Sequence, residues 1–335
     1  MTFHYEEAAG AVTSKTGARE DEKAGPPWTS PDARRRPAIQ AIVVNYNAGQ
    51  ALLDCVASLW SEGVDRLLVV DNGSTDGSIE QLASEDRDVQ IVSSGRNVGF
   101  GGGVNYGAGR SAGELLLVCN PDIVLRPGAL GALTRRIEAD PSLGLVGPAL
   151  VAPDGSERTS GRAFPTLRRS GLHALVGLAA PGSARSTRYR AASRAGAATG
   201  IVDWVTGACL LVRREAFDAV GGFDERYFMY VEEVDLCWRL ARAGWRTGYE
   251  AGAVVVHLAG VSTAAHPYRM VKAHHVSLWR FACRTAEGAD RLLLPFVAPA
   301  VVVRWALVAL KELACRPARA PARAPGGSRR PRHRA

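Results

Sequence analysis

The stretch IQAIVVNYNAGQALLDCVASLWSEGVDRLLVVD, residues 39–71, consists of two short apolar runs separated by a longer amphipathic segment. Short runs rich in Val, Ile and Leu are typical of buried strands, whereas the middle segment has the length and pattern of a helix. The same alternation continues downstream, so we expect strands at 39–44, 66–70, 89–92 and 114–119 and helices at 50–61, 77–84, 102–112 and 127–139. This order predicts an α/β fold with a Rossmann-like, mainly parallel sheet flanked by helices.

The rest of the chain changes character several times. Residues 152–200 contain Gly, Ser, Arg and Ala but few strand signals, which predicts an irregular insertion, and structured sequence resumes at about residue 201. Long helical segments at 266–284 and 290–313 predict a C-terminal helical extension. We therefore expect a flexible leader at 1–37, a main domain at 38–264, C-terminal helices at 265–315 and a disordered basic tail at 316–335.

The composition favours a folded protein of a reducing compartment. The chain has 335 residues, 47% of them hydrophobic, which is enough for one large domain. Its six cysteines are scattered without a C-x-x-C pair, and we expect buried thiols rather than a disulfide framework or a zinc module. The N-terminal residues are rich in acids and lack an early apolar run, so we expect the cytoplasm.

The C-terminal part predicts association with an anionic membrane surface. Arg316 to Ala335 carries seven arginines and no acid, against a net charge of +8 for the whole chain. The preceding stretch, Leu292 to Leu310, is almost wholly apolar but contains Pro295, Pro299 and Arg304, which favours an interfacial helix over a membrane span. Nucleic-acid binding by the tail is the alternative, but the body contains no motif for it.

Two polar clusters follow the first two predicted strands. Asn45-Tyr46-Asn47 follows the first, and D-N-G-S-T-D-G, which begins at Asp71, follows the second. Because the ligand site of a parallel sheet lies beyond the carboxyl ends of its strands, Asn45, Asn47 and Asp71 are placed to contact a pyrimidine and a ribose. The alternative for D-N-G-S-T-D-G is a plain turn followed by a helix cap, which the same residue types favour.

A glycine-rich segment, Gly95 to Gly103, follows the third predicted strand and precedes a helix that carries Asn105. Its backbone amides, together with Arg96 and Asn97, are placed to face a diphosphate at a helix N-terminus. No G-K-[ST] follows, which excludes a Walker loop. A dinucleotide-binding loop is disfavoured because it would follow the first strand and not the third.

Asn120-Pro121-Asp122 follows the fourth predicted strand, and there Asp122 can offer a carboxylate to Mg²⁺ or Mn²⁺ between itself and two phosphates. His257 ends the β-rich run 254–256 and could complete the coordination of that metal. The alternatives are a turn aspartate and a strand-end histidine without a metal.

Residues 227–239, YFMYVEEVDLCWR, hold three acids in four positions. Asp235 and Arg239 are spaced for a helical ion pair, and acids at a helix start stabilise the helix dipole. The functional interpretation is that Glu232 or Glu233 removes a proton from an acceptor hydroxyl.

These motifs resemble, in order, those of family 2 glycosyltransferases of the GT-A fold. They are N-Y-N at 45–47, D-N-G-S-T-D-G at 71–77, N-V-G-F-G-G-G-V-N at 97–105, N-P-D at 120–122, W-V-T-G-A-C at 204–209, the segment 221–239 and H-x-x-G-x-S-T at 257–263. Within the family the chain is similar to rhamnosyltransferases that act on a lipid-linked GlcNAc diphosphate. The resemblance implies an inverting, metal-dependent transfer from dTDP-β-L-rhamnose to the GlcNAc 3-hydroxyl of a polyprenyl diphosphate, for the arabinogalactan linker of a cell wall, at the cytoplasmic face of the membrane.

The resemblance also assigns roles to residues. Asn47 and Asp71 would contact the nucleotide with Arg96, Asn97 and Asn105 nearby, while Asp122 and His257 would hold Mg²⁺ or Mn²⁺. The acid pair that reads Glu-Asp in relatives is Glu232-Glu233 here, which places Glu233 as the base and leaves Asp235 as a further candidate.

Three other functions remain open from the sequence. A related transferase could use a galactofuranosyl or other deoxysugar donor. A processive synthase is disfavoured because Arg304-Trp305 is preceded by Val301 where a Q-x-x-R-W motif needs Gln. A non-catalytic membrane-surface protein would not need Asp71, Asp122, Glu233 and His257 together.

Overall fold

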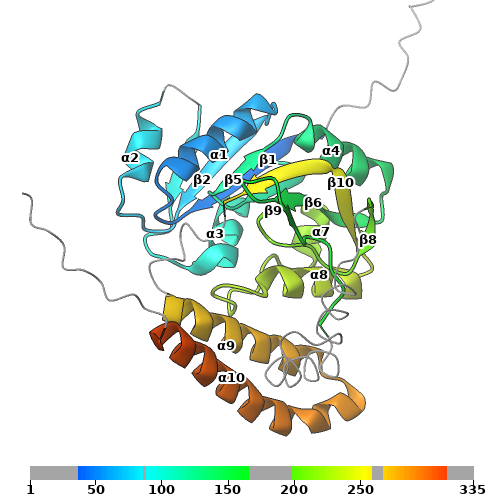
Figure 1. Cartoon of the computed structure of the whole chain (residues 1–335). Helices are drawn as coiled ribbons and strands as arrows, with labels where there is room; N and C mark the ends of the chain where they lie inside the picture. The colour runs from blue at the N-terminus through cyan, green and yellow to red at the C-terminus, as the bar shows by residue number, and fades with distance from the viewer. Residues whose placement is uncertain (1–36, 86–87, 166–197, 259–266, 315–335) are drawn as a thin grey trace, which may run out of the picture. The chain divides into compact units, whose positions relative to one another are not determined.

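A computed structural model describes residues 37–85, 88–165, 198–258 and 267–314. They contain one ten-stranded sheet with helices around it (Figure 1). Eight strands follow the order β3-β2-β1-β4-β9-β6-β10-β5, and the other two, β7 and β8, pair with β6 and β10. The strands are β1 (Ile39–Asn45), β2 (Arg66–Asp71), β3 (Gln90–Ser93), β4 (Leu115–Cys119), β5 (Ile123–Leu125), β6 (Leu143–Val151), β7 (Glu157–Arg158), β8 (Gly200–Val202), β9 (Cys209–Arg213) and β10 (Arg246–His257).

The sheet is mainly parallel, as predicted. β3, β2, β1 and β4 pair in parallel, and so do β6 and β10. β9 lies antiparallel between β4 and β6, so β6 and β10 run in the same direction as the first four strands. β5 pairs antiparallel with β10.

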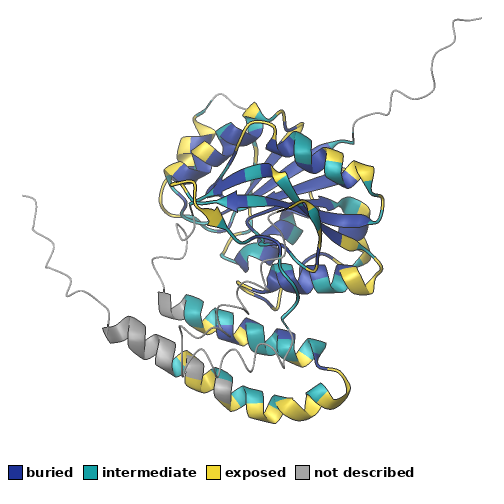
Figure 2. Cartoon of the chain, turned by 45° about the vertical axis from the view of Figure 1, so that its right-hand side comes forward, coloured by how far each residue is buried: buried dark blue, intermediate teal, exposed yellow. Residues whose placement is uncertain are grey.

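Helices cover both faces of the sheet. The central strand β1 has apolar side chains on both of its faces, and each face must be buried against a layer of helices. Its Ala41 and Val43 belong to one hydrophobic cluster, whereas Ile42 and Val44 belong to the other. The first cluster includes α1 (Gln50–Ser61), α2 (Ser78–Ala83) and α4 (Ala129–Ala139). The second includes α3 (Gly99–Ala108), α7 (Arg214–Ala219) and α8 (Glu232–Arg242). Buried residues fill the sheet between these layers (Figure 2).

The predicted strands and most predicted helices are confirmed to within two residues, but α3 differs. It covers residues 99–108, where 102–112 was predicted. Glycine is a weak helix former, yet a Cβ on Gly103 would lie 2.6 Å from Val44 Cγ1, and one on Gly107 would lie 2.8 Å from Ile42 Cγ2. Close packing of α3 against β1 therefore outweighs helix propensity.

The predicted C-terminal helices are present as α9 (Pro267–Thr285), the 3₁₀ helix η1 (Gly288–Leu293) and α10 (Leu294–Ala314). α10 continues through Pro299 instead of breaking there. Phe281 of α9 packs with Tyr227, Val231 and Val234, which joins the helix to the start of α8. Among the helices of the described residues, none is long and apolar enough to cross a membrane.

One composition-based prediction is wrong in part. Cys55, Cys119, Cys209 and Cys237 are buried as expected, but Cys283 on α9 is exposed. The leader at 1–36, most of the insertion (166–197), residues 259–266 and the tail at 315–335 lie outside the described residues.

Candidate active site

A pocket opens where β1 and β4 end, on the side predicted for a ligand. Its cavity volume is about 450 Å³, a size typical of small-molecule sites. Five predicted site residues line it: Asn97, Asp122, Glu232, Glu233 and His257. Its remaining lining comes from residues 44, 46, 72, 99, 100, 120, 121, 206–208, 229 and 230.

Asp122 and His257 lie side by side. β5 begins just after Asp122, β10 ends at His257, and His257 is paired with Ile123 in their antiparallel ladder. The backbone N–H of Leu258 donates to the Asp122 carbonyl at 3.0 Å. As a result His257 Nε2 lies 3.3 Å from Asp122 Oδ1, and both side chains are largely buried.

The pair suits a hard divalent cation. A carboxylate oxygen and an imidazole nitrogen are both ligands for Mn²⁺, and Mg²⁺ is commonly held by one or two carboxylates together with substrate phosphates. The described residues contain no group of three or more His, Cys, Asp or Glu side chains placed for a metal. Among the described residues, Asp122 and His257 are the ones that would hold such a cation.

Glu232 and Glu233 enter the pocket at the start of α8. The two residues before them, Tyr230 and Val231, have φ of 66° and 72°. Positive φ is unfavourable for a β-branched residue, so the backbone is strained where it delivers the acids. Gly207 lies over Glu233, and a Cβ on this glycine would stand 3.2 Å from Glu233 Cβ.

Both glutamates have perturbed acidity. Burial, reinforced by the charge of Glu233, raises the pKa of Glu232 well above its ordinary value. Burial also raises the pKa of Glu233, although backbone hydrogen bonds and the positive charge of Arg162 oppose the rise. A carboxyl group with a raised pKa is a stronger base than an ordinary glutamate, which suits proton abstraction near neutral pH.

The side chains of the first two polar clusters hydrogen-bond to residues 74–78, although α2 has Gly77 at its N-cap and no side-chain cap hydrogen bond. Asn45 Nδ2 donates to the hydroxyls of Ser74 and Ser78, each at 3.0 Å. Asn47 Oδ1 accepts from the backbone of Thr75 at 2.7 Å, and Asp71 Oδ1 accepts from the backbone of Ser74 at 2.9 Å. These three side chains do not line the pocket. Nucleotide contact by them stays a prediction.

Arg96, Asn105 and Asp235 also lie outside the pocket lining. Arg96 is exposed. Asn105 makes two hydrogen bonds to the backbone of Phe223. Asn105 Oδ1 accepts from the Phe223 N–H, and Asn105 Nδ2 donates to the Phe223 carbonyl, both at 2.9 Å. Asp235 is fully buried and paired with Arg239 at 2.7 Å, the ion pair that the sequence spacing predicted.

Several lining residues were not singled out as site residues from the sequence. They belong to the quoted motifs but were given no role: Asn72, Phe100, Asn120, Thr206, Met229 and Tyr230. Asn120 Nδ2 lies 3.5 Å from His257 Nε2. Proximity to predicted residues at the strand ends was the available signal, because side chains next to a strand end share its edge of the sheet.

An α/β sheet with an acid pair and an Asp–His pair at the carboxyl ends of its strands is the arrangement expected of a glycosyltransferase, and the comparisons show that class. The chain belongs to glycosyl transferase family 2, whose family model matches residues 40–221. It is similar to the N-acetylglucosaminyl-diphospho-decaprenol L-rhamnosyltransferase of Mycobacterium tuberculosis, at 39% identity over 75% of this chain and 85% of that protein. It also matches the low-salt glycan biosynthesis hexosyltransferase Agl10 of Haloferax volcanii, at 28% identity over 63% of this chain and 64% of that protein.

Solved structures support the GT-A fold. Mannosyltransferase PcManGT from Pyrobaculum calidifontis, in complex with GDP-Man and Mn²⁺, matches with a TM-score of 0.51 and 16% identity over 86% of this chain and 83% of that one. GalNAc-T7 with UDP, GalNAc and Mn²⁺ matches with a TM-score of 0.50 and 13% identity over 67% of this chain and 44% of that one. At these identities the likeness concerns the fold.

Proposed function

We propose that the chain transfers L-rhamnose from dTDP-β-L-rhamnose to the GlcNAc 3-hydroxyl of GlcNAc-diphospho-decaprenol, with inversion, during synthesis of the arabinogalactan linker. The observation that carries the chemistry is that Glu233 and the Asp122–His257 pair line one pocket. The choice of substrates is supported by the 39% identity to a rhamnosyltransferase whose name gives this acceptor.

In the proposed reaction, the acceptor hydroxyl attacks the anomeric carbon of rhamnose from the face opposite the nucleotide. Glu233 takes the hydroxyl proton as the new C–O bond forms, and the bond to the diphosphate breaks with its electron pair leaving on dTDP. Glu232, whose pKa is raised further, holds a proton beside it and avoids a second buried charge.

Asp122 and His257 would hold the divalent metal. When bound, a cation at this position neutralises the charge that develops on the departing diphosphate. Asn97, which lines the same pocket, fixes the entrance of α3 because its Oδ1 accepts from the Gly99 N–H at 2.9 Å. We assign the nucleotide to the side of the pocket that Asn97 lines. Five further residues are proposed to take part in nucleotide binding there: Asn45, Asn47, Asp71, Arg96 and Asn105.

We further propose that the protein works as a peripheral protein on the cytoplasmic face of the membrane. The side chains of Leu292 and Phe296, in η1 and α10, are 73% and 75% exposed. Large apolar side chains exposed on consecutive turns suit an interfacial helix, and the seven arginines of the tail would add attraction to anionic lipid.

The test is a donor competition. Purified protein with Mg²⁺ and synthetic GlcNAc-diphospho-polyprenol is given dTDP-rhamnose or UDP-galactofuranose, and products are followed by mass spectrometry. Transfer of rhamnose that is lost in Glu233→Gln and Asp122→Ala is expected. Glu215→Gln, an exposed acid on α7, is the matched control. Transfer from UDP-galactofuranose instead would overturn the rhamnosyl assignment. Transfer from neither donor would favour another acceptor first and a non-catalytic role second.

A further inference from the structure

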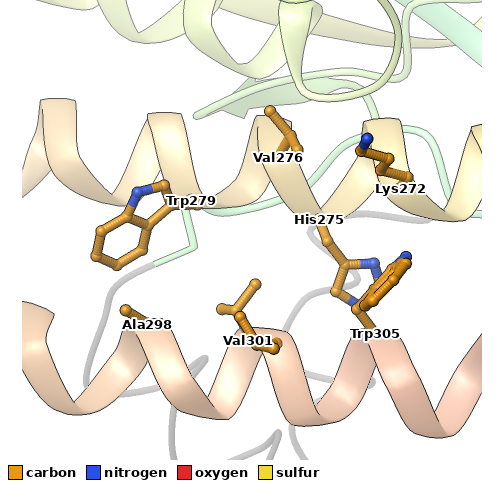
Figure 3. Close-up of a pocket in the computed structure, with 8 residues that line it drawn as sticks. Lys272, His275, Val276, Trp279, Ala298, Val301 and Trp305 are labelled. Atoms are coloured by element: carbon orange, nitrogen blue, oxygen red, sulfur yellow. The ribbon is translucent and has the colours of Figure 1, made fainter.

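A second concave surface lies between the two C-terminal helices. α9 contributes residues 272, 275, 276 and 279, and α10 contributes residues 298, 301, 302 and 305. Both sets follow the spacing i, i+3, i+4, i+7, so each is one stripe of its helix. Figure 3 shows His275 and Trp279 projecting from α9 toward α10, and Val301 projecting from α10 toward α9. The lining is almost entirely apolar.

Several apolar residues that line this surface are exposed to solvent, whereas ordinary packing of two helices would bury them. Val276 of α9 is 45% exposed, and Val302 and Trp305 of α10 are 60% and 38% exposed. Residues at the contact stripe of two packed helices are normally buried, because helix association removes that stripe from water. The exposed apolar floor therefore forms a groove that an apolar chain can fill.

A cationic pocket adjoins the groove and shares Val276 and Trp279 with it. Its polar lining is Arg226, Arg280 and Arg284. Arg226 and Arg284 are paired with carboxylates, Asp224 for both and Asp235 for Arg284. Arg280 donates to the backbone carbonyl of Arg226, and no ion pair among the described residues includes it. Three guanidinium groups facing two carboxylates leave positive charge for an anion.

The cationic pocket also leads to the active site. Arg226 and Met229, which lines the active site, are three residues apart, so their Cα atoms are at most about 11 Å apart. Ser277 of α9 donates to the Met229 carbonyl at 3.1 Å. On the groove side, the ring of Tyr230 contacts that of His274, with centroids 5.4 Å apart. The apolar groove and the arginine pocket therefore lie next to each other along α9. The loop 226–231 then connects the arginine pocket to the acid pair at the start of α8.

We propose that this succession is the binding path of a polyprenyl diphosphate, with the isoprenoid chain in the α9–α10 groove and the diphosphate on Arg226 and Arg280. The sugar on the diphosphate then reaches Glu233. This inference rests on the proposed function, because it takes the acceptor class from there. The occupant is the acceptor's own chain and not a bilayer, since the groove is concave and ends at a cationic pocket, whereas Leu292 and Phe296 lie outside its lining.

Binding without any donor tests the path directly. Geranylgeranyl diphosphate and inorganic diphosphate are titrated calorimetrically, below the micelle-forming concentration of the lipid and with a chelator present. The wild type is expected to bind the lipid at least about tenfold more tightly than inorganic diphosphate, because apolar carbons are buried. Val302→Asp should remove most of that advantage while leaving inorganic diphosphate unaffected. Arg280→Gln should weaken both ligands.

The matched control is Val303→Asp, next to Val302 on α10, equally apolar and 54% exposed but outside the groove lining. It should leave both affinities at the wild-type value. Equal losses from Val302→Asp and Val303→Asp, or a lipid that binds no better than inorganic diphosphate, would overturn the path. Geranylgeraniol binding as tightly as its diphosphate would point to a bilayer acyl chain and likewise overturn it.

The same preparations are then assayed for sugar transfer. If the lipid binds as predicted but no rhamnose is transferred, the proposed binding path is retained and the proposed donor is rejected. Rhamnosyl transfer with no dependence of lipid affinity on Val302 or Arg280 keeps the proposed function and rejects the path.

Discussion

Arg284 of α9 donates a hydrogen bond from Nη1 to Oδ1 of Asp235 at 2.8 Å, and the Asp235 side chain is completely buried in α8. Arg239 binds the other carboxylate oxygen at 2.7 Å. Asp235 thus ties the C-terminal helices to the helix that carries the acid pair. We therefore assign it a structural role and do not retain it among the candidate bases.

Replacement of Arg284 by Ala should destabilise the protein by about 2–4 kcal/mol, because it leaves the buried Asp235 charge with one partner fewer. The measurement is chemical denaturation followed by circular dichroism. Arg242→Ala is the control: its pair with Glu287 is 64% exposed on both sides and should cost at most about 1 kcal/mol. Equal losses of unfolding free energy in the two variants would show that the buried ion pair stabilises the fold no more than the exposed one.

Glu233→Gln should lower kcat by about 10² to 10⁴ while leaving the fold intact, since the amide cannot accept the hydroxyl proton. Glu233→Asp should retain more activity than the amide, because it keeps a carboxylate. In the wild type, kcat/KM should rise with pH through the raised pKa of Glu233, as the base must be ionised. A flat profile in the acidic range would argue against this residue as the base.

Glu232→Gln should stabilise the fold at neutral and alkaline pH. The pKa of Glu232 is raised in the folded protein, so the folded state binds this proton more tightly than the unfolded chain. The resulting stability is fully present below the unfolded pKa of about 4.3 and is lost as pH rises through the folded pKa. The variant cannot ionise, so its free energy of unfolding should exceed that of the wild type at about pH 8 and converge with it near pH 4. A variant less stable at both pH values would contradict this account.

Removal of divalent cations by a chelator should abolish transfer, and Mg²⁺ or Mn²⁺ should restore it. Independently of activity, Asp122→Asn and His257→Gln should weaken Mn²⁺-dependent binding of dTDP by at least about tenfold, measured by calorimetry. Asp218→Asn, an exposed acid on α7, should have no effect. Nucleotide affinity that does not respond to Mn²⁺ in the wild type would remove the metal role of the pair.

Gly103→Ala should destabilise the protein by about 1–3 kcal/mol, because its Cβ would overlap Val44. Gly131→Ala in α4 should act in the opposite direction, with a gain of up to about 1 kcal/mol. There the new methyl group meets only the end of the flexible Arg135 side chain, at 3.2 Å. Thermal denaturation of both variants would check the pair, and a destabilised Gly131→Ala would contradict it.

The order of strands and helices up to residue 139 was predictable, because buried parallel strands are continuous apolar runs and the helices between them are amphipathic. Asp122, Glu233 and His257 were predicted from their position at strand ends or a helix start, and they line one pocket. Their roles stay predictions. The insertion of β9 between β4 and β6 was not predictable, since no local pattern specifies which strands pair over such a sequence separation.

The hydrogen-bond partners of individual polar side chains could not be predicted from the sequence either. Asn105 has the residue type of a ligand contact, but its amide matches the backbone of Phe223, which lies far along the chain. Asn45 likewise hydrogen-bonds Ser74 and Ser78 across the sheet edge. A sequence gives the residue type and the neighbouring strand end, whereas the orientation of the side chain depends on packing between distant segments.

The position of β9 between β4 and β6 sets the order in which the protein can be completed during synthesis. When β6 leaves the ribosome, neither it nor β4 has its β9 partner, and the strand that joins them is still more than fifty residues away. Unpaired strand edges in such a nascent chain recruit other chains. Fragments that end between β6 and β9 should therefore aggregate, and the acid pair and His257, which all lie beyond β9, are the last parts of the pocket to be made.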